Sequence, residues 1–470
     1  MIVAQLNYFS VAMINLSPFS LLATAEEETA QEPEGAIVLA SVLLSLVAIY
    51  IASKIGGELC SRINLPPVLG ELVGGVVIGV SVLGVLVFPE TGAAAEDSLI
   101  IAFLERTTDL QPEAAQAVFE AQSEVIIVLS ELGVVILLFE IGLESDLKEL
   151  LRVGPQAAAV AITGVVAPFV AGTGGLYYLF GVPAVPAIFA GAALTATSIG
   201  ITAKVLAELG RLNSQEGQII IGAAVIDDVL GIIILAVVAS LIKTGNIEVS
   251  NILYLVVSAA AFLVGTILIG RFLSPFLIGM VKEMNTRGQL LLTALVFAFT
   301  LAYIATAINL EAILGAFAAG LVLAETDKRK ELEEQVAPVA DLVVPVFFVC
   351  VGARTDLGVL NPAVPSNREG LILAAFLIVV AIIGKAMAGF TIFGRPDINK
   401  LAIGVGMIPR GEVGLVFAGV GSASGALSPS TEAAIIVMVI LTTFLAPPFL
   451  RVVLPEGSET EAETSEQEGT

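Results

Sequence analysis

The chain has 470 residues, of which 57% are hydrophobic and only 14% are charged, a balance that excludes an ordinary soluble globular protein. The formal net charge of −23 lies largely in two acidic stretches outside the apolar blocks, 26–34 and 456–468, so we interpret it as solvated ends of the chain. The absence of histidine excludes imidazole chemistry, and the two cysteines indicate no disulfide framework.

The first apolar stretch, 2–23, is followed by Ala23-Thr24-Ala25, which has the small-x-small form of a signal-peptidase site. It lacks a basic region before it, because the first Lys or Arg is Lys54. Two interpretations of residues 1–35 therefore stay open: a signal peptide or an extra N-terminal helix, each followed by an acidic external segment.

Thirteen further apolar blocks have about the length, roughly 20 residues, that a helix needs to cross about 30 Å of hydrocarbon. They predict an all-α polytopic membrane protein with a transmembrane domain at 36–454 and an acidic, disordered cytoplasmic tail at 455–470. The blocks lie at 36–54, 66–88, 124–143, 154–180, 184–206, 217–243, 250–279, 287–308, 310–326, 338–353, 370–394, 399–421 and 431–453.

Positive charges predict the orientation of these blocks. When the loops are placed alternately on two sides, 15 of the 21 Lys and Arg residues share the side of the loop after the first block. The other side has four, and two residues, Lys385 and Arg410, lie within blocks. The positive-inside rule then predicts an external N-terminus and a cytoplasmic C-terminus.

The order of the blocks predicts an internal symmetry. The fifth and twelfth blocks are both polar and interrupted by glycine, and they hold equivalent places in two sets of six blocks on either side of the seventh. Because the offset of seven is odd, equivalent helices run in opposite directions. We therefore predict inverted repeats at 36–243 and 287–453, joined by a linker helix at 250–279, an architecture that builds a midplane site from broken helices.

Two adjacent carboxylates, Asp227 and Asp228, lie about halfway along the sixth block. A charge near the bilayer centre costs at least about 2.5 kcal/mol, so such residues usually mark an ion pathway. Adjacent residues of a helix point about 100° apart, so one partner cannot neutralise both carboxylates equally. We favour an ion pathway over the alternative, an ion pair that serves packing alone.

Lys385 is the only lysine deep inside an apolar block, the eleventh. An unpaired ammonium would be strongly disfavoured there, so we predict a pair with one aspartate, which leaves the other available to bind a cation or a proton. The alternative is a lysine that extends to the membrane surface.

The two polar blocks carry the residues that we assign to broken helices beside the site. If both helices unwind and cross, their carbonyls and hydroxyls could ligate a cation, while an arginine and a glutamate offset the dipoles of the half-helix ends. The hydroxyls could instead bond within their own turns. These residues are Thr195, Thr197, Ser198, Pro409, Arg410 and Glu412.

Three glutamates, Glu71, Glu140 and Glu144, also lie in or at the end of apolar blocks. We interpret them as interfacial or pairing residues rather than as ligands of the site.

In this order, Thr195-Ala-Thr197-Ser198, Asp227-Asp228, Lys385 and Pro409-Arg410-Gly411-Glu412 resemble the cation/proton antiporter-2 family, above all its NapA-type sodium/proton antiporters, including cyanobacterial members. The similarity extends from about Leu65 to about Leu454. It implies thirteen helices, a homodimer, a core domain with crossed broken helices, and elevator-like alternating access. It also implies Asp228 as the main cation and proton carboxylate, Asp227 as the partner of Lys385, and Thr197 and Ser198 beside the site.

The predicted function is exchange of a monovalent cation, Na⁺ or Li⁺, for protons in pH homeostasis. The cation would bind at Asp228 while it is transported. We expect the protein to have no enzymatic activity, no cofactor and no nucleic-acid partner. A K⁺/H⁺ antiporter is the alternative within the family, although its glutathione-gated potassium members typically have Gln-Asp in place of Asp227-Asp228 and end in a nucleotide-binding domain, which we do not expect here. The membrane would be a bacterial inner membrane, or a thylakoid membrane in a cyanobacterium.

Other classes fit less well. A sodium-coupled organic-anion symporter shares the inverted-repeat architecture and is the hardest to exclude. An intramembrane aspartyl protease needs carboxylates that face each other from separate helices, commonly within Gly-x-Gly-Asp, which does not occur here. A channel would favour a repeated ring of pore-lining residues over a single asymmetric cluster.

Overall fold

The computed structural model describes residues 35–108, 110–244, 249–283, 286, 288–363, 365–392 and 397–454, and this part of the chain is all helix, turn and loop, without a strand. The predicted all-α class is confirmed. The stretches predicted as a signal peptide or extra helix and as an acidic tail lie outside the described residues.

The helices follow the apolar blocks in chain order. They are α2 (Gly35–Arg62), α3 (Pro67–Ile78), α4 (Leu99–Thr108), α5 (Pro112–Glu144), α6 (Leu147–Arg152), α7 (Gly154–Leu179), α8 (Ala184–Ala193), α9 (Ile199–Glu208), α10 (Gln215–Thr244), α11 (Val249–Glu283), α12 (Gln289–Ala307), α13 (Ala312–Ala324), α14 (Arg329–Ala353), α15 (Pro365–Ala388), α16 (Lys400–Gly406), α17 (Glu412–Ala423) and α18 (Pro429–Val453). Four short 3₁₀ helices are η1 (Pro89–Thr91), η2 (Ala95–Asp97), η3 (Leu357–Leu360) and η4 (Gly389–Thr391).

Nine of the described helices are long and apolar enough to cross a bilayer, and four shorter apolar helices accompany them. Length and composition identify the longer helices as membrane crossings but do not decide the shorter ones, so the count of thirteen crossings stays a prediction.

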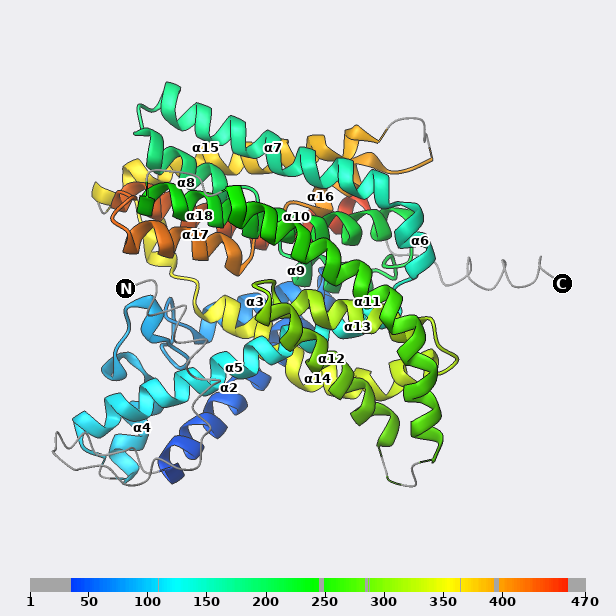
Figure 1. Ribbon diagram of the computed structural model, residues 1–470. Helices are drawn as coiled ribbons and strands as arrows, with labels where there is room; N and C mark the ends of the chain where they lie inside the picture. The colour runs from blue at the N-terminus through cyan, green and yellow to red at the C-terminus, as the bar shows by residue number, and fades with distance from the viewer. Residues whose placement is uncertain are drawn as a thin grey trace.

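The helices form two bundles, which lie above and below each other in Figure 1. The core bundle consists of α7, α8, α9, α10, α15, α16, α17 and α18, and the scaffold bundle of α2, α3, α5, α12, α13 and α14. The long helix α11 contacts α10 in one bundle and α12 and α13 in the other. The bundles therefore have separate interiors and share an interface.

Equivalent contacts recur in the two halves of the chain. In the core bundle α7 contacts α8 and α10, as α15 contacts α16 and α18, and in the scaffold bundle α2 contacts α3, as α12 contacts α13. Each half also has one helix broken into two short pieces at the same place in the order, α8 with α9 and α16 with α17. This arrangement shows that the order of the helices repeats, while the inversion of one half against the other stays a prediction.

Two boundaries differ from the prediction by ten residues or more: α5 begins at Pro112 rather than at residue 124, and α3 ends at Ile78 rather than at residue 88. The chain turns back there, since Val85 and Leu86 donate backbone hydrogen bonds to the carbonyl of Ile78. A Cβ added at Gly79 would lie 2.4 Å from the carbonyl oxygen of Ala353, so glycine lets the turn pack against α14. Hydropathy alone does not detect this turn, because its residues are as apolar as the helix.

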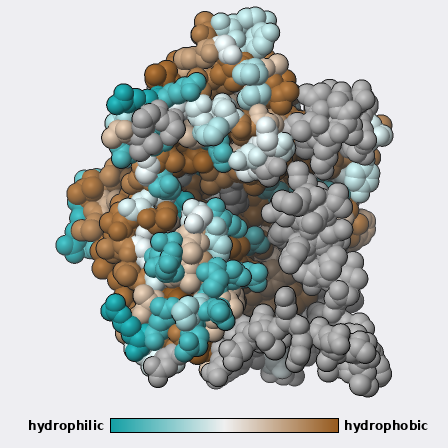
Figure 2. Space-filling view, turned by 90° about the vertical axis from the view of Figure 1, so that its left-hand side faces the viewer, coloured by the Kyte–Doolittle hydropathy of each residue, from teal (hydrophilic) through white to brown (hydrophobic). Residues whose placement is uncertain are grey.

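The sides of the molecule are apolar, as a bilayer requires. On α2 the exposed residues Leu39, Leu43, Val47 and Ile51 recur every four residues along one face. Figure 2, which looks onto the left-hand end of Figure 1, shows hydrophilic residues gathered near the middle of that end and hydrophobic residues along the left-hand edge of the view. We interpret the apolar sides as the surface toward lipid.

Within the scaffold bundle, α2 and α3 pack with their backbones in contact. A Cβ added at Gly56 would lie 2.0 Å from the carbonyl oxygen of Gly70, and one added at Gly70 would lie 2.0 Å from that of Gly56. Small residues that allow such close approach are the usual basis of helix packing in membranes, where no hydrophobic driving force joins helices.

This contact predicts that Gly70→Ala separates the two helices and destabilises the protein, by about 1 to 3 kcal/mol, the usual cost of overpacking. The matched control is Gly174→Ala on α7, where an added Cβ meets nothing within 4 Å. Thermal unfolding in detergent should show a lower Tm for Gly70→Ala and an unchanged or higher Tm for Gly174→Ala. Equal Tm values for the two variants would contradict the role of the close contact.

Candidate functional site

The two broken helices meet through their unwound segments, 194–198 and 407–411, in the middle of the core bundle. The backbone N–H of Ser198 donates to the carbonyl of Pro409 at 2.8 Å. The hydroxyl of Thr197 donates to the carbonyl of Met407 at 3.2 Å, and that of Thr202 to the carbonyl of Gly406 at 2.8 Å. Groups released by unwinding one helix therefore bond to groups released by unwinding the other.

The local sequence explains why the second helix unwinds here. Pro409 has no backbone N–H and disfavours helix in the residue before it. Gly411 is extended, with φ −123° and ψ −152°, and a Cβ added to it would lie 2.9 Å from the Cβ and Oγ of Ser198. Glycine thus lets the two segments approach at their crossing.

The aspartate pair lies on α10, which contacts α8, α9, α16 and α17, the four pieces of the broken helices. Asp227 is fully buried, and Asp228 is 5% exposed. An uninterrupted helix therefore carries both carboxylates to the crossing from one side.

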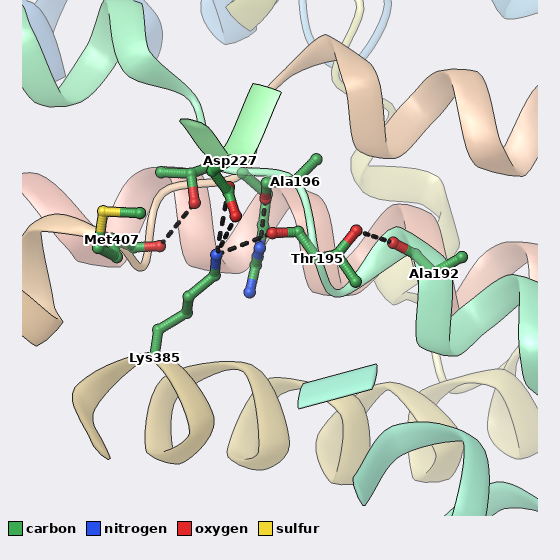
Figure 3. A network of polar contacts seen from close by, with 8 residues as sticks. Ala192, Thr195, Ala196, Asp227, Lys385 and Met407 are labelled. Carbon is green, nitrogen blue, oxygen red and sulfur yellow. Dashed lines mark hydrogen bonds and ion pairs between the residues drawn. The ribbon is translucent and has the colours of Figure 1, made fainter. Parts of the chain in front are cut away.

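Lys385 reaches the same place from α15 (Figure 3). Its Nζ lies 3.1 and 3.3 Å from the two carboxylate oxygens of Asp227 and donates to the carbonyl oxygen of Thr195 at 2.8 Å. A Cβ added at Gly164 on α7 would lie 3.4 Å from Nζ, so the glycine leaves room for the ammonium. Both partners of this ion pair are fully buried, and Lys385 also interacts electrostatically with Asp228.

Arg410 holds the crossing from the second broken helix. Its guanidinium is fully buried, donates to the carbonyl oxygen of Ala196 in the first break, and interacts electrostatically with Asp227. Its own carbonyl accepts a hydrogen bond from the hydroxyl of Thr443 on α18. The sequence suggested that Arg410 offsets a helix dipole, whereas the structure shows a direct bond to the opposite break.

The remaining expected site residues have different positions. The Thr195 hydroxyl bonds back to Ala192 at 2.7 Å, so this residue contributes its carbonyl, rather than its side chain, to Lys385. Glu412 begins α17, but its side chain lies outside the described residues.

Sequence reasoning did not identify Thr443 or the carbonyls of Ala196 and Met407. The only signal for Thr443 is a pair of hydroxyl residues, 442–443, in an apolar block, and carbonyls leave no signal in a sequence at all.

Chemically, the site offers two carboxylates, two basic groups, and carbonyl and hydroxyl oxygens from unwound backbone, all at one point between helices. Oxygen donors of this kind suit hard cations. In the described part of the chain, no group of three or more His, Cys, Asp or Glu residues could hold a resident metal ion. Any bound cation would rely on carboxylate and backbone oxygens.

The ion pair predicts a coupling free energy between Lys385 and Asp227. Breaking a buried pair from one side costs about 3 to 5 kcal/mol, whereas neutral residues of similar volume on both sides can be nearly neutral for stability. The double variant Lys385→Gln/Asp227→Asn should therefore unfold at a higher temperature than at least one single variant. A double-mutant cycle from unfolding in detergent measures this coupling, and strictly additive destabilisation would show that the residues do not interact.

Comparison with known proteins identifies the family. The sequence model of the transmembrane sodium/hydrogen exchanger family matches residues 28–455. The chain is 70% identical over 443 residues to the high-affinity Na⁺/H⁺ antiporter NhaS3 of Synechocystis sp., covering 94% of this chain and 95% of that protein. It is 33% identical over 411 residues to the Na⁺/H⁺-K⁺ antiporter GerN of Bacillus cereus, covering 86% of this chain and 94% of that protein.

A solved structure shares the fold: that of the sodium proton antiporter MjNhaP1 from Methanocaldococcus jannaschii has a TM-score of 0.59 at 16% identity, and the match covers 89% of this chain and 99% of that one. The extent of the family match, together with the buried carboxylates at the crossing of two broken helices, shows that this chain belongs to the transmembrane sodium/hydrogen exchanger family.

Proposed function

We propose that this chain exchanges Na⁺ for protons across a membrane, and that Asp228 binds the two in competition. The observation that carries the proposal is the place of the two buried carboxylates, Asp227 and Asp228, on α10 at the crossing of the two broken helices, where Lys385 forms an ion pair with Asp227. The names of the relatives, as Na⁺/H⁺ antiporters, support the same activity.

The chemistry follows from charge. The carboxylate of Asp228, 5% exposed among apolar helices, is stabilised when either a proton or a dehydrated cation neutralises it. Carbonyl and hydroxyl oxygens of the breaks, such as those of Thr197 and Ser198, would complete the shell of a cation but are not needed by a proton. One site thus serves both ions in turn, which is the requirement for exchange.

Selectivity for Na⁺ over K⁺ is the finer part of the proposal. The 70% identical relative is named as a Na⁺/H⁺ antiporter, whereas the name of the 33% identical relative also includes K⁺. Proteoliposome exchange with Na⁺, Li⁺ and K⁺ under an imposed pH gradient separates these alternatives. Cation uptake with proton movement in the same direction would indicate a symporter instead.

We propose that access alternates by movement of the core bundle against the scaffold bundle, with the scaffold joining two copies as a homodimer. The half-helix α9 contacts α3 and α5 of the scaffold, whereas the main contacts of α8 and α17, within the described residues, are all with core helices. The interface is thus packed at the end of the molecule where α2 and α9 end. Sliding of one bundle past the other would move the crossing between the two sides.

The central assignment predicts that Asp228→Asn abolishes exchange without unfolding the protein, because an amide carries no charge and takes up no proton. Exchange in proteoliposomes should fall to the level of empty vesicles. The control is Asp327→Asn, a change at an exposed turn residue, which should exchange normally. Ordinary transport by Asp228→Asn with unchanged cation affinity would show that another group binds the ion.

The charge asymmetry of the loops predicts that the end of the molecule with Arg62 is cytoplasmic. Lys148 and Glu96 are both exposed, and the predicted topology puts them on opposite sides. In a background without Cys60 and Cys350, a membrane-impermeant maleimide added to intact cells should label Glu96→Cys but not Lys148→Cys. The reverse pattern would contradict the predicted orientation.

A further inference from the structure

A stripe of three residues on α9 faces the scaffold bundle. Gly200, Lys204 and Glu208 recur every four residues and so lie on one face of this half-helix. The first of them shows where the face points, since a Cβ added at Gly200 would lie 3.4 Å from Cγ2 of Val134 and 3.7 Å from Cδ2 of Leu137, both on α5.

The lysine of this stripe attracts four carboxylates, three of them on α3 and α5, the scaffold helices that α9 contacts. Lys204 interacts electrostatically with Glu71 on α3, with Glu140 and Glu144 on α5, and with Glu208 on its own helix. All five side chains are half-buried, so water screens their interactions less than on an open surface. Three of the four carboxylates belong to the scaffold bundle, and the lysine belongs to the core bundle.

The other basic residues nearby do not attract the same set of carboxylates as Lys204. Lys54 attracts only Glu71 of the four, Arg329 only Glu144, and Arg451 only Glu208. Negative charge is further increased by Asp341 on α14, which repels Glu71 and Glu140, and by Glu333, which repels Glu144. Lys204 is therefore the one basic residue, in the described part of the chain, that interacts with all four carboxylates.

The attraction acts across the interface that has to open during alternating access. In this structure α9 is packed against α3 and α5 at the end of the molecule with Arg62. We propose that Lys204 is a charge lock that holds this side of the interface closed. The lock rests on the alternating access proposed above, and it regulates the population of closed and open forms.

Loss of the ammonium would remove the attraction and leave carboxylates facing one another, since Glu208 on the core bundle repels Glu71 on the scaffold. The closed form would lose stability relative to the open form, while the ion site at Asp228 would keep its contacts. A residue of this kind shifts an equilibrium between two states without a change in the intrinsic affinity of either state.

Accessibility of a thiol in the closed interface tests the lock. Val68 is fully buried in the first turn of α3, and its backbone N–H faces the Glu208 carboxylate. In a background with Cys60→Ser and Cys350→Ala, Val68→Cys is labelled with a membrane-impermeant maleimide applied to the end of the molecule with Arg62. Adding Lys204→Gln should raise the labelling rate about tenfold, which corresponds to a population shift of about 1.4 kcal/mol.

Two control variants test whether the labelling rate depends on the positive charge at position 204 and on its place in the structure. Lys204→Arg keeps the positive charge and should keep the slow rate, as should Lys148→Gln, which removes an exposed lysine of α6. If Lys204→Gln does not fold, Glu140→Gln/Glu144→Gln removes two of the three scaffold carboxylates that attract Lys204 and should also raise the labelling rate.

An unchanged labelling rate in the folded Lys204→Gln or glutamine-pair variant overturns the proposal, and so does a Lys204→Arg variant that labels as fast as Lys204→Gln. The assay needs no transport. If the protein does not exchange Na⁺ for H⁺ but Lys204→Gln raises the labelling rate, the proposed function alone is refuted. If the protein exchanges normally but Lys204→Gln leaves the labelling rate unchanged, the charge lock alone is refuted.

Discussion

The arrangement of the core bundle depends on the need to neutralise a fully buried ammonium group, that of Lys385. Lys385 and Asp227 are both fully buried and 3.1 Å apart, and either charge alone would cost several kcal/mol in this position. The pair therefore joins α15 to α10 through side chains. Because Nζ also donates to the carbonyl of Thr195, it fixes the first break against both helices. A single buried charge thus determines the relative position of three elements.

The crossing of the broken helices solves a second problem, that of backbone groups left without helical partners inside a membrane. Ser198 bonds to Pro409, and the guanidinium of Arg410 bonds to Ala196, so each break supplies partners for the other. The remaining carbonyl and hydroxyl oxygens lie beside the carboxylates of α10. In the function proposed above, the same irregular backbone that needs these bonds would also supply cation ligands, which would explain why the site lies at the crossing.

The interior of the scaffold bundle and its interface with the core bundle differ in how they pack, and the difference fits the movement proposed above. In the scaffold, α2 and α3 touch backbone to backbone at Gly56 and Gly70, which favours one rigid arrangement. At the interface with the core, half-buried charges around Lys204 replace part of this packing. In the alternating access proposed above, charged contacts of this kind could be exchanged for water when the interface opens, whereas interlocked backbones could not.

The sequence by itself determined the all-helical class, the order of the helices and the residues that need partners, because hydropathy and intramembrane charge act locally on each segment. It singled out Lys385 and the two aspartates for that reason. The family resemblance named Asp227 as the partner of Lys385, and the structure has that pair. The tertiary structure decided that Arg410 bonds to Ala196, and it placed Thr443 at the crossing. These contacts join groups far apart in the chain, often through backbone carbonyls that every residue has, so no residue pattern encodes them.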